Sequence, residues 1–236
     1  MSYHSQYDKK RREQILATMV VSNLIVFENP QYLICNKPFD LQIDGYRPLT
    51  LEKLILLYRP DMMLRFCHQL DYATSGLIVV AKTKCAAAKA NKLFENRSIS
   101  KHYTALVSGH LNNQEVVTIK IANHPVHKHQ MKVSNDAGKT AKTYITPLQL
   151  GSWNSRPVTK VLIQPITGRR HQIRLHCLHI GHPIVGDINY ARDSKPFRMM
   201  LHAQRLHLPF SEPLSPIDVE TEDPFDILDS SNPILP

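Results

Sequence analysis

Short apolar runs separated by turn residues dominate the chain from residue 23 onward. The runs NLIVFE and QYLICNKP, rich in Ile, Val and Tyr and broken by ENP, predict two strands. Later alternating segments predict further strands: RFCHQL, GLIVVAK, SKHYTALVSG, VVTIKIA, AKTYITPLQL, RPVTKVLIQPIT and RMMLHAQRLHL. The strands outnumber the helices and follow one another mostly in hairpin order, which favours an α+β domain with a largely antiparallel sheet.

Helical spacing marks three segments within this array of strands. The first covers residues 49–60 and stops at Pro60, and the second begins at Thr83. The third follows Gly168, and Gly181 supplies its stop.

The pattern divides the chain into three parts. Residues 1–22 are predicted to form a basic arm or helix, residues 23–210 one large domain, and residues 211–236 an acidic, Pro-rich tail. No apolar run approaches the roughly 20 residues that a membrane-spanning helix needs, and the N-terminus lacks a targeting signal. We therefore expect no association with a membrane.

Charge is distributed unevenly along the 236 residues. The formal net charge is +9, yet no Lys or Arg follows Arg205 whereas seven acidic residues do, and without those seven it would be +16. Such an excess attracts a polyanion through counterion release, so nucleic acid is the favoured partner class; a solvated basic surface is the alternative.

The four cysteines form no CxxC pair and stand in apolar or helical contexts: Cys35, Cys67, Cys85 and Cys177. Reduced core cysteines of this kind are typical of a cytoplasmic protein.

Three segments combine residue types that carry chemistry. In HQLDYATSG, Asp71 falls on a strand-to-loop junction where a substrate can reach it, although a loop Asp followed by Thr and Ser is more often a turn cap. In TGRRHQIR, Arg170 and Arg174 are one helical turn apart, and such clusters contact either phosphate or solvent. In KHYTALVSG, Tyr103 stands on a strand, where a tyrosine usually belongs to the core.

Together these segments resemble the RluA family of pseudouridine synthases. That family has H-R-L-D-x-x-T-S-G, K-x-Y-x-A-L-V-x-G and G-R-x-H-Q-[IL]-R-x-H followed by G-H-P-I-x-G-D; this chain has HQLDYATSG, KHYTALVSG, GRRHQIRLH and GHPIVGDINY in the same order. The resemblance covers roughly residues 23 to 210. It implies a bent, mainly antiparallel mixed sheet flanked by helices, with a central basic cleft.

The resemblance also implies the site residues and their roles. Asp71 matches the catalytic aspartate, Tyr103 the tyrosine that packs against the flipped uracil, and Arg174 the arginine paired with the aspartate. The remaining motif residues are expected to bind RNA: His68, Gln69, Thr74, Ser75, Arg169, Arg170, His171 and Gln172. Isomerisation of uridine involves neither redox chemistry nor net hydrolysis, so no cofactor or metal is expected.

Three positions depart from the family pattern. Gln69 replaces the usual arginine after the motif histidine, Asp40 stands where glycine is common, and Arg170 stands where Thr or Ser is common. FCHQLD with PFRMMLHA resembles a subgroup that includes vertebrate RNA pseudouridylate synthase domain-containing proteins. The missing guanidinium leaves the mode of base flipping open.

The expected substrate is a stem-loop of ribosomal or transfer RNA, and the protein is expected to be a monomer. A catalytically idle RNA-binding module is the main alternative, motivated by Gln69. A glycoside hydrolase is a weaker one, because no second carboxylate accompanies Asp71 in its motif. The histidines around Cys177 fit no common zinc pattern.

Overall fold

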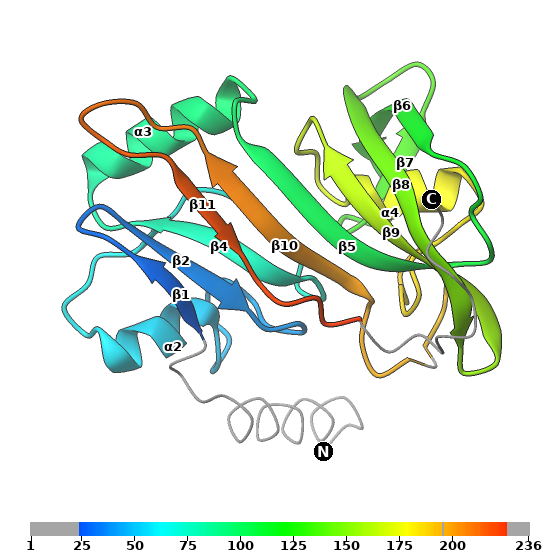
Figure 1. The fold of residues 1–236 in the computed structure, drawn as a ribbon, viewed down its shortest axis with the longest axis horizontal. Helices are drawn as coiled ribbons and strands as arrows, with labels where there is room; N and C mark the ends of the chain where they lie inside the picture. The colour runs from blue at the N-terminus through cyan, green and yellow to red at the C-terminus, as the bar shows by residue number, and fades with distance from the viewer. Residues whose placement is uncertain (1–23, 195, 226–236) are drawn as a thin grey trace. The chain divides into compact units, whose positions relative to one another are not determined.

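The computed structural model describes residues 24–194 and 196–225 and divides the chain into two compact units, residues 1–92 and 93–236. The expected basic arm, residues 1–22, lies outside the described residues. Figure 1 shows the elements of both units. The helix α3, Lys84–Glu95, leads from the first unit into the second.

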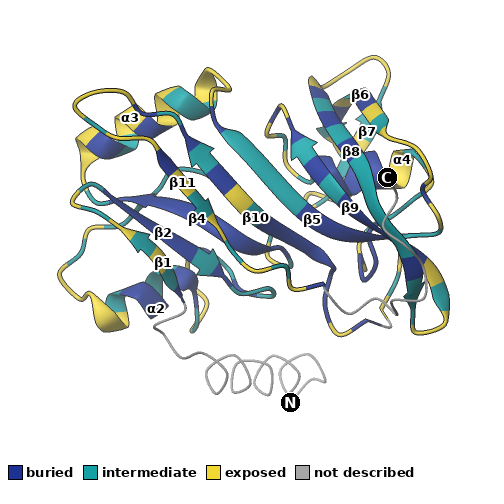
Figure 2. Cartoon of the chain, viewed as in Figure 1, coloured by how far each residue is buried: buried dark blue, intermediate teal, exposed yellow. Residues whose placement is uncertain are grey.

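The first unit is built on a small antiparallel sheet. Its central strand β4 pairs with β2, which pairs with β1, and the short β3 also pairs with β4. The elements are β1 (Ile25–Glu28), β2 (Tyr32–Lys37), α2 (Leu51–Tyr58), β3 (Arg65–Phe66) and β4 (Ser75–Ala81). All seven residues of β4 are buried (Figure 2), which explains the unbroken apolar run GLIVVA.

One face of this sheet is covered by α2, which begins at the N-cap Thr50, whose side chain accepts a hydrogen bond from the Lys53 amide. The apolar face of α2 enters a cluster with residues from β2 and β4, including Leu51, Leu54, Leu33 and Val80. Helical spacing therefore correctly predicted α2 and also α3, which begins at Lys84 and buries Ala86 and Ala90.

The second unit contains a longer antiparallel sheet in the order β11-β10-β5-β9-β8-β6-β7. Its elements are β5 (Ser100–Ser108), β6 (Glu115–Asn123), β7 (Met131–Ser134), β8 (Lys139–Trp153), β9 (Arg156–Pro165), α4 (Gln172–His179), β10 (Leu201–Leu208) and β11 (Ile217–Glu220). Asn154 and Ser155 both have positive φ between β8 and β9, as a tight hairpin turn requires.

Two clusters of described residues contribute to the core of this unit. One gathers Leu106, Val158, Met200 and Phe225, and the other packs Leu175 of α4 against Ile121 and Ala141 of the sheet. The predicted α+β class with mainly antiparallel pairing is confirmed.

Three local expectations were wrong. The strand before Asp71 is only two residues long, so Asp71 lies in a loop and not at a strand end. Arg170 precedes α4, because His171 has a φ of 55° and helical geometry begins only at Gln172. The described part of the expected acidic tail, residues 211–225, contributes β11 and the buried Phe225 to the second unit.

Among the described residues, no helix has both the length and the apolar character needed to cross a membrane.

Candidate active site

Asp71 lies in the first unit, on the loop that leads into the buried strand β4. The segment after β3 stays hydrogen-bonded to β4 for two more residues. The Cys67 amide donates to the Val79 carbonyl, and the ring Nε2 of His68 accepts from the Val79 amide at 3.1 Å. The Asp71 carbonyl then accepts a hydrogen bond from the Thr74 amide at 3.1 Å and closes a turn. Asp71 itself is half-buried, so its carboxylate stands on a constrained backbone near the surface.

Lys37 fixes the backbone of this loop through hydrogen bonds from its side chain. Its side chain is fully buried, and its Nζ donates to the carbonyl oxygens of Pro38, Leu41 and Tyr72 at 2.9, 2.9 and 3.1 Å. Lys37 therefore ties the segment after β2 to the residue that follows Asp71. Lys37 is part of the NKP sequence that the resemblance covers, and this was the signal that could have identified it as a positioning residue.

The other residues predicted near Asp71 differ in exposure. Gln69 and Tyr72 are exposed, whereas Thr74 and Ser75 are 2% and 5% exposed. The enclosed side chains of Thr74 and Ser75 shape the start of β4. Contact of His68, Gln69, Thr74 and Ser75 with RNA stays a prediction.

Asp40 has a left-handed backbone with φ of 54°. Glycine adopts this conformation without strain, and Asp is among the few other residues that tolerate it. The departure from the family pattern at this position therefore preserves the backbone that glycine would supply.

Tyr103 lies in the second unit on β5, between Ile163 of β9 and Ala203 of β10, and is half-buried. Lys101, two residues earlier on the same face of β5, is a residue that the sequence analysis passed over. Burial lowers the pKa of the Lys101 ammonium, which lies 3.7 Å from where a Cβ on Gly168 would stand. Its place in the K-x-Y motif was the sequence signal that could have identified Lys101 as a candidate site residue.

Arg174 lies on α4 and is 5% exposed. Its Nε and Nη2 atoms both donate to the carboxylate of Asp187 at 2.8 Å, which makes a buried bidentate ion pair. Asp187 also accepts from the amides of Asn189 and Tyr190. The sequence analysis did not assign Asp187, although it is the last residue of the quoted motif GHPIVGD.

Tyr190 contacts both Arg174 and His171. The guanidinium carbon of Arg174 lies 4.8 Å from the centroid of the Tyr190 ring, and the Tyr190 hydroxyl lies 2.6 Å from Nδ1 of His171. The same hydroxyl accepts from the Met131 amide. Arg174 is therefore held by a carboxylate and by an aromatic face.

Gln172 is buried, and both ends of its side-chain amide are used within the protein. Its Oε1 accepts from Thr167 Oγ1 at 2.6 Å and from the Arg169 amide at 3.0 Å. Its Nε2 donates to the Lys142 carbonyl and to Thr143 Oγ1. These bonds fix the turn before α4, and contact of Gln172 and His171 with RNA stays a prediction.

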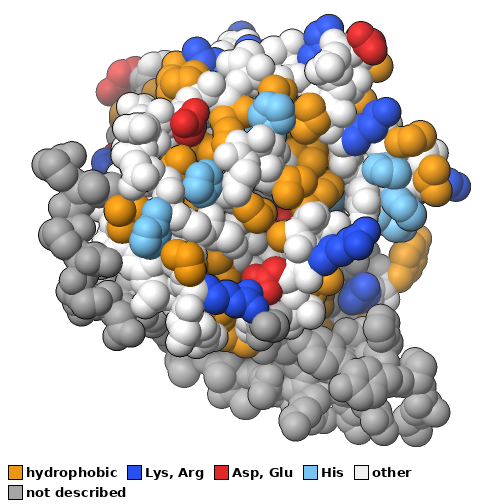
Figure 3. Space-filling model, turned by 90° about the vertical axis from the view of Figure 1, so that its right-hand side faces the viewer, with side chains coloured by type: hydrophobic (Ala, Val, Ile, Leu, Met, Phe, Trp, Pro, Cys, Tyr) orange, Lys and Arg blue, Asp and Glu red, His pale blue; other side chains and the backbone are white. Residues whose placement is uncertain are grey.

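Arg169 and Arg170 occupy that turn and reach outward. Arg169 Nε donates to the Thr140 carbonyl at 3.3 Å, and the exposed Arg170 donates to the His129 carbonyl at 3.1 Å. Figure 3 shows Lys, Arg and His side chains spread over the face drawn there. Such a surface suits phosphate contacts.

His176 is fully buried on α4, and neither ring nitrogen has a hydrogen-bond partner among the residues that the structure describes. Burial lowers its pKa to about 4, so the ring is neutral at pH 7. Within the described residues no three His, Cys, Asp or Glu side chains converge as metal ligands would.

Each unit thus contributes its own part of the predicted site. Asp71 and its supporting residues belong to the first unit, and Tyr103, Arg174 and the turn at residues 167–171 belong to the second. Direct pairing between Asp71 and Arg174, and the central basic cleft, stay predictions.

Comparisons with known proteins point to one family. The family model described as RNA pseudouridylate synthase matches residues 31–179. The chain is 38% identical over 220 residues to RNA pseudouridylate synthase domain-containing protein 1 of Danio rerio, covering 85% of this chain and 74% of that one. It is 34% identical over 208 residues to the dual-specificity RNA pseudouridine synthase RluA of Yersinia pestis, covering 86% of this chain and 100% of that one.

A solved structure has the same fold. Human RNA pseudouridylate synthase domain containing 1 superposes with a TM-score of 0.77 at 39% identity, over 85% of this chain and 83% of that chain. Asp71, Tyr103 and Arg174 all fall within the segment that the family model matches. The chain belongs to the RNA pseudouridylate synthase family, and with it to the RluA type of pseudouridine synthases.

Proposed function

We propose that this protein isomerises specific uridines of structured RNA to pseudouridine, with Asp71 as its catalytic carboxylate. The observation that carries the proposal is the Asp71 loop: a half-buried carboxylate stands between the buried strand β4 and a backbone fixed by the buried Lys37. Family membership supplies the reaction class, which is an isomerisation.

The reaction rearranges bonds within one nucleotide. The bond from N1 to C1′ breaks, the uracil turns while it stays bound, and a bond forms from C5 to C1′. The proton on C5 is then lost and N1 carries a proton, so atoms and electrons balance without an external reactant. An ionised Asp71 either attacks C1′ or removes the 2′ proton to give a glycal.

Arg174 and Tyr103 are assigned to holding the nucleotide and the charge. A guanidinium beside Asp71 would keep the carboxylate ionised when the nucleotide displaces water. The aromatic ring of Tyr103 would pack against the extruded uracil and return about 1 to 3 kcal/mol of the unstacking energy. Arg169 and Arg170, which stand on the exposed turn before α4, would contact phosphates.

The charge of the chain and its family support RNA as the substrate class. We infer a stem-loop of ribosomal or transfer RNA, bound by a monomeric protein in the cytoplasm without a cofactor or metal. A catalytically idle module is not favoured, because the chain keeps Asp71 in its motif and its relatives include pseudouridine synthases.

Mapping of pseudouridines in RNA from cells with and without this gene tests the function and identifies the substrate. We expect one or a few sites to lose pseudouridine when the gene is removed and to regain it with the wild-type gene but not with Asp71→Ala. Sites that respond equally to Asp71→Ala and to the wild type would point to the idle module instead.

A further inference from the structure

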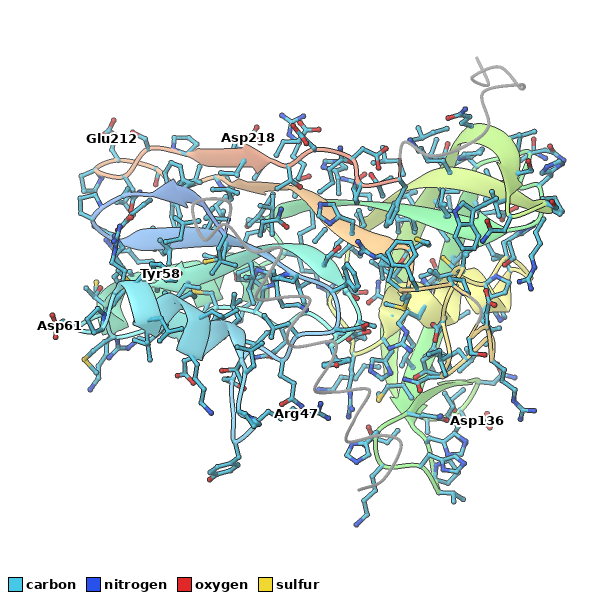
Figure 4. All side chains as sticks on the ribbon, turned by 90° about the horizontal axis from the view of Figure 1, so that it is seen from below. Arg47, Tyr58, Asp61, Asp136, Glu212 and Asp218 are labelled. Atoms are coloured by element: carbon cyan, nitrogen blue, oxygen red, sulfur yellow. The ribbon has the colours of Figure 1, made fainter. Side chains whose placement is uncertain are left out.

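A loop of the first unit projects from the start of α2. Its base is closed by two backbone hydrogen bonds, from the Leu51 amide to the Gln42 carbonyl at 2.8 Å and from the Glu52 amide to the Ile43 carbonyl at 2.9 Å. Residues 44–48 between these bonds are all exposed. Figure 4 shows Arg47 on this loop and Tyr58 at the opposite end of α2.

Aromatic and cationic side chains meet on this loop. Tyr46 is 106% exposed relative to its reference, which is unusual for a large aromatic side chain. The guanidinium carbon of Arg47 lies 5.4 Å from the centroid of the Tyr72 ring, within the range of a cation–π contact, and Tyr72 is 40% exposed.

Two lysines, Lys37 and Lys53, donate hydrogen bonds to the backbone of the two residues that make this contact. Lys37 Nζ donates to the Tyr72 carbonyl, and Lys53 Nζ donates to the Arg47 carbonyl. The contact between Arg47 and Tyr72 is therefore anchored at both residues, and Tyr72 is the direct neighbour of Asp71 in the chain.

We propose that Tyr46, Arg47 and Tyr72 form a stacking surface for an unpaired base of the RNA next to the target uridine. The inference rests on the proposed function and assigns to this surface the recognition of single-stranded nucleotides beside Asp71. Aromatic rings and planar guanidinium groups stack on bases of any sequence, and the positive charge of Arg47 suits the adjacent phosphates.

Gln69 gives this surface a reason to supply a guanidinium near Asp71. The motif position that carries an arginine in most of the family carries an uncharged, exposed Gln69 here, on the same loop as Asp71 and Tyr72. Arg47 brings a guanidinium to that loop from a different segment. The neighbouring base would thus stay stacked on this surface while the target uridine is extruded.

Binding of a uridine oligomer of about 12 nucleotides tests the surface without requiring turnover. We expect Tyr46→Ala and Arg47→Ala each to raise the Kd for this oligomer at least about 5-fold, since a stacked base contributes about 1 to 3 kcal/mol. Arg47→Lys should recover less than half of the lost affinity because it restores charge without a planar face. The Kd for inorganic polyphosphate should change little with Tyr46→Ala, because that variant keeps every charge.

Tyr58→Ala is the matched control, since Tyr58 is an exposed tyrosine of the same unit at the far end of α2. All variants should keep the wild-type thermal midpoint, because the altered side chains are exposed. The inference is overturned if the wild type does not bind the oligomer, or if Tyr46→Ala and Arg47→Ala behave like Tyr58→Ala. Failure of the proposed function would look different: the oligomer would bind as expected, but no RNA would gain pseudouridine.

Discussion

Arg174 and Asp187 form a buried ion pair in the second unit. Both side chains are at most 5% exposed, and two parallel hydrogen bonds fix the guanidinium plane. Removing one partner of a buried pair is destabilising, so a variant at Asp187 that keeps an acceptor oxygen is the one that separates positioning of Arg174 from folding. We expect Asp187 to position Arg174 for the proposed reaction.

Asp187→Asn should lower kcat on the order of 100-fold while the Kd for RNA changes little. The neutral amide cannot hold the guanidinium in the same plane, and misplacement by about 1 Å is enough for a loss of this size. Single-turnover pseudouridine formation and filter binding with the mapped RNA separate the two effects.

Asp218→Asn is the control for that variant. Asp218 also pairs bidentately with an arginine, Arg205, but both side chains are more than 40% exposed. Exposed pairs contribute little, so kcat should stay near the wild-type value. Equal losses in both variants would contradict the positioning role of Asp187.

Two buried histidines make folding dependent on pH. Burial lowers the pKa of His176 and of His202 to about 4, whereas an unfolded histidine titrates near 6.5. Between these values the unfolded chain binds more protons than the folded one, so stability falls as the pH falls from about 6.5 to 4. Each histidine adds a slope of up to about 1.4 kcal/mol per pH unit.

Urea unfolding at pH 7 and pH 5 measures this slope. His176→Leu should reduce the loss of stability between the two pH values, because it removes one of the titrating groups. His179→Leu, at an exposed position of the same helix, should reduce the loss less, because the charge of His179 lowers the pKa of His176 less than burial does. An unchanged loss in His176→Leu would show that His176 does not titrate in this way.

At the level of elements, the acidic segment after Arg205 forms the strand β11 and so joins the sheet of the second unit. Its pairing with β10 places Asp218 beside Arg205, while Ile217 is buried. Lys160 of β9 pairs with Asp223 at 2.7 Å, and Thr221 bonds His202. Asp218 and Asp223, two of the acidic residues that stood out in the sequence, therefore pair with basic residues of the second unit.

Phe225→Ala should lower the free energy of unfolding by about 3 to 5 kcal/mol, the usual cost of removing a fully buried aromatic side chain. Phe225 is 1% exposed and packs with Leu106, Val158 and Met200. Phe197→Ala, at a residue 60% exposed, should cost far less. Similar urea midpoints for Phe225→Ala and the wild type would mean that the segment after β11 is not part of the core.

Local patterns predicted the helices α2 and α3 because their apolar spacing and end signals lie within the segments themselves. The strand predicted at RFCHQL was too long: β3 ends at Phe66, and at residue 68 the His68 side chain accepts the hydrogen bond from the Val79 amide. The strand β11 was missed because it depends on pairing with the distant β10 and not on its own composition.

At the level of the whole molecule, the sequence offered candidates for the site but not the groups that support them. The family resemblance of the motifs singled out Asp71, Tyr103 and Arg174 as candidates, and their roles stay predictions. Lys37 and Asp187 bond to site residues 35 and 13 positions away in the chain, and only the folded backbone brings such groups together. The roles of the motif residues came from family resemblance, because a loop aspartate alone is more often a turn cap.

Release of tritium from RNA labelled at uracil C5 tests the central claim most directly. Wild-type protein should release tritium from the mapped RNA in proportion to the pseudouridine formed. Asp71→Asn should release no more than the background without protein while it still binds that RNA with nearly wild-type affinity. Tritium release by Asp71→Asn at the wild-type rate would contradict the assignment of Asp71 as the catalytic carboxylate.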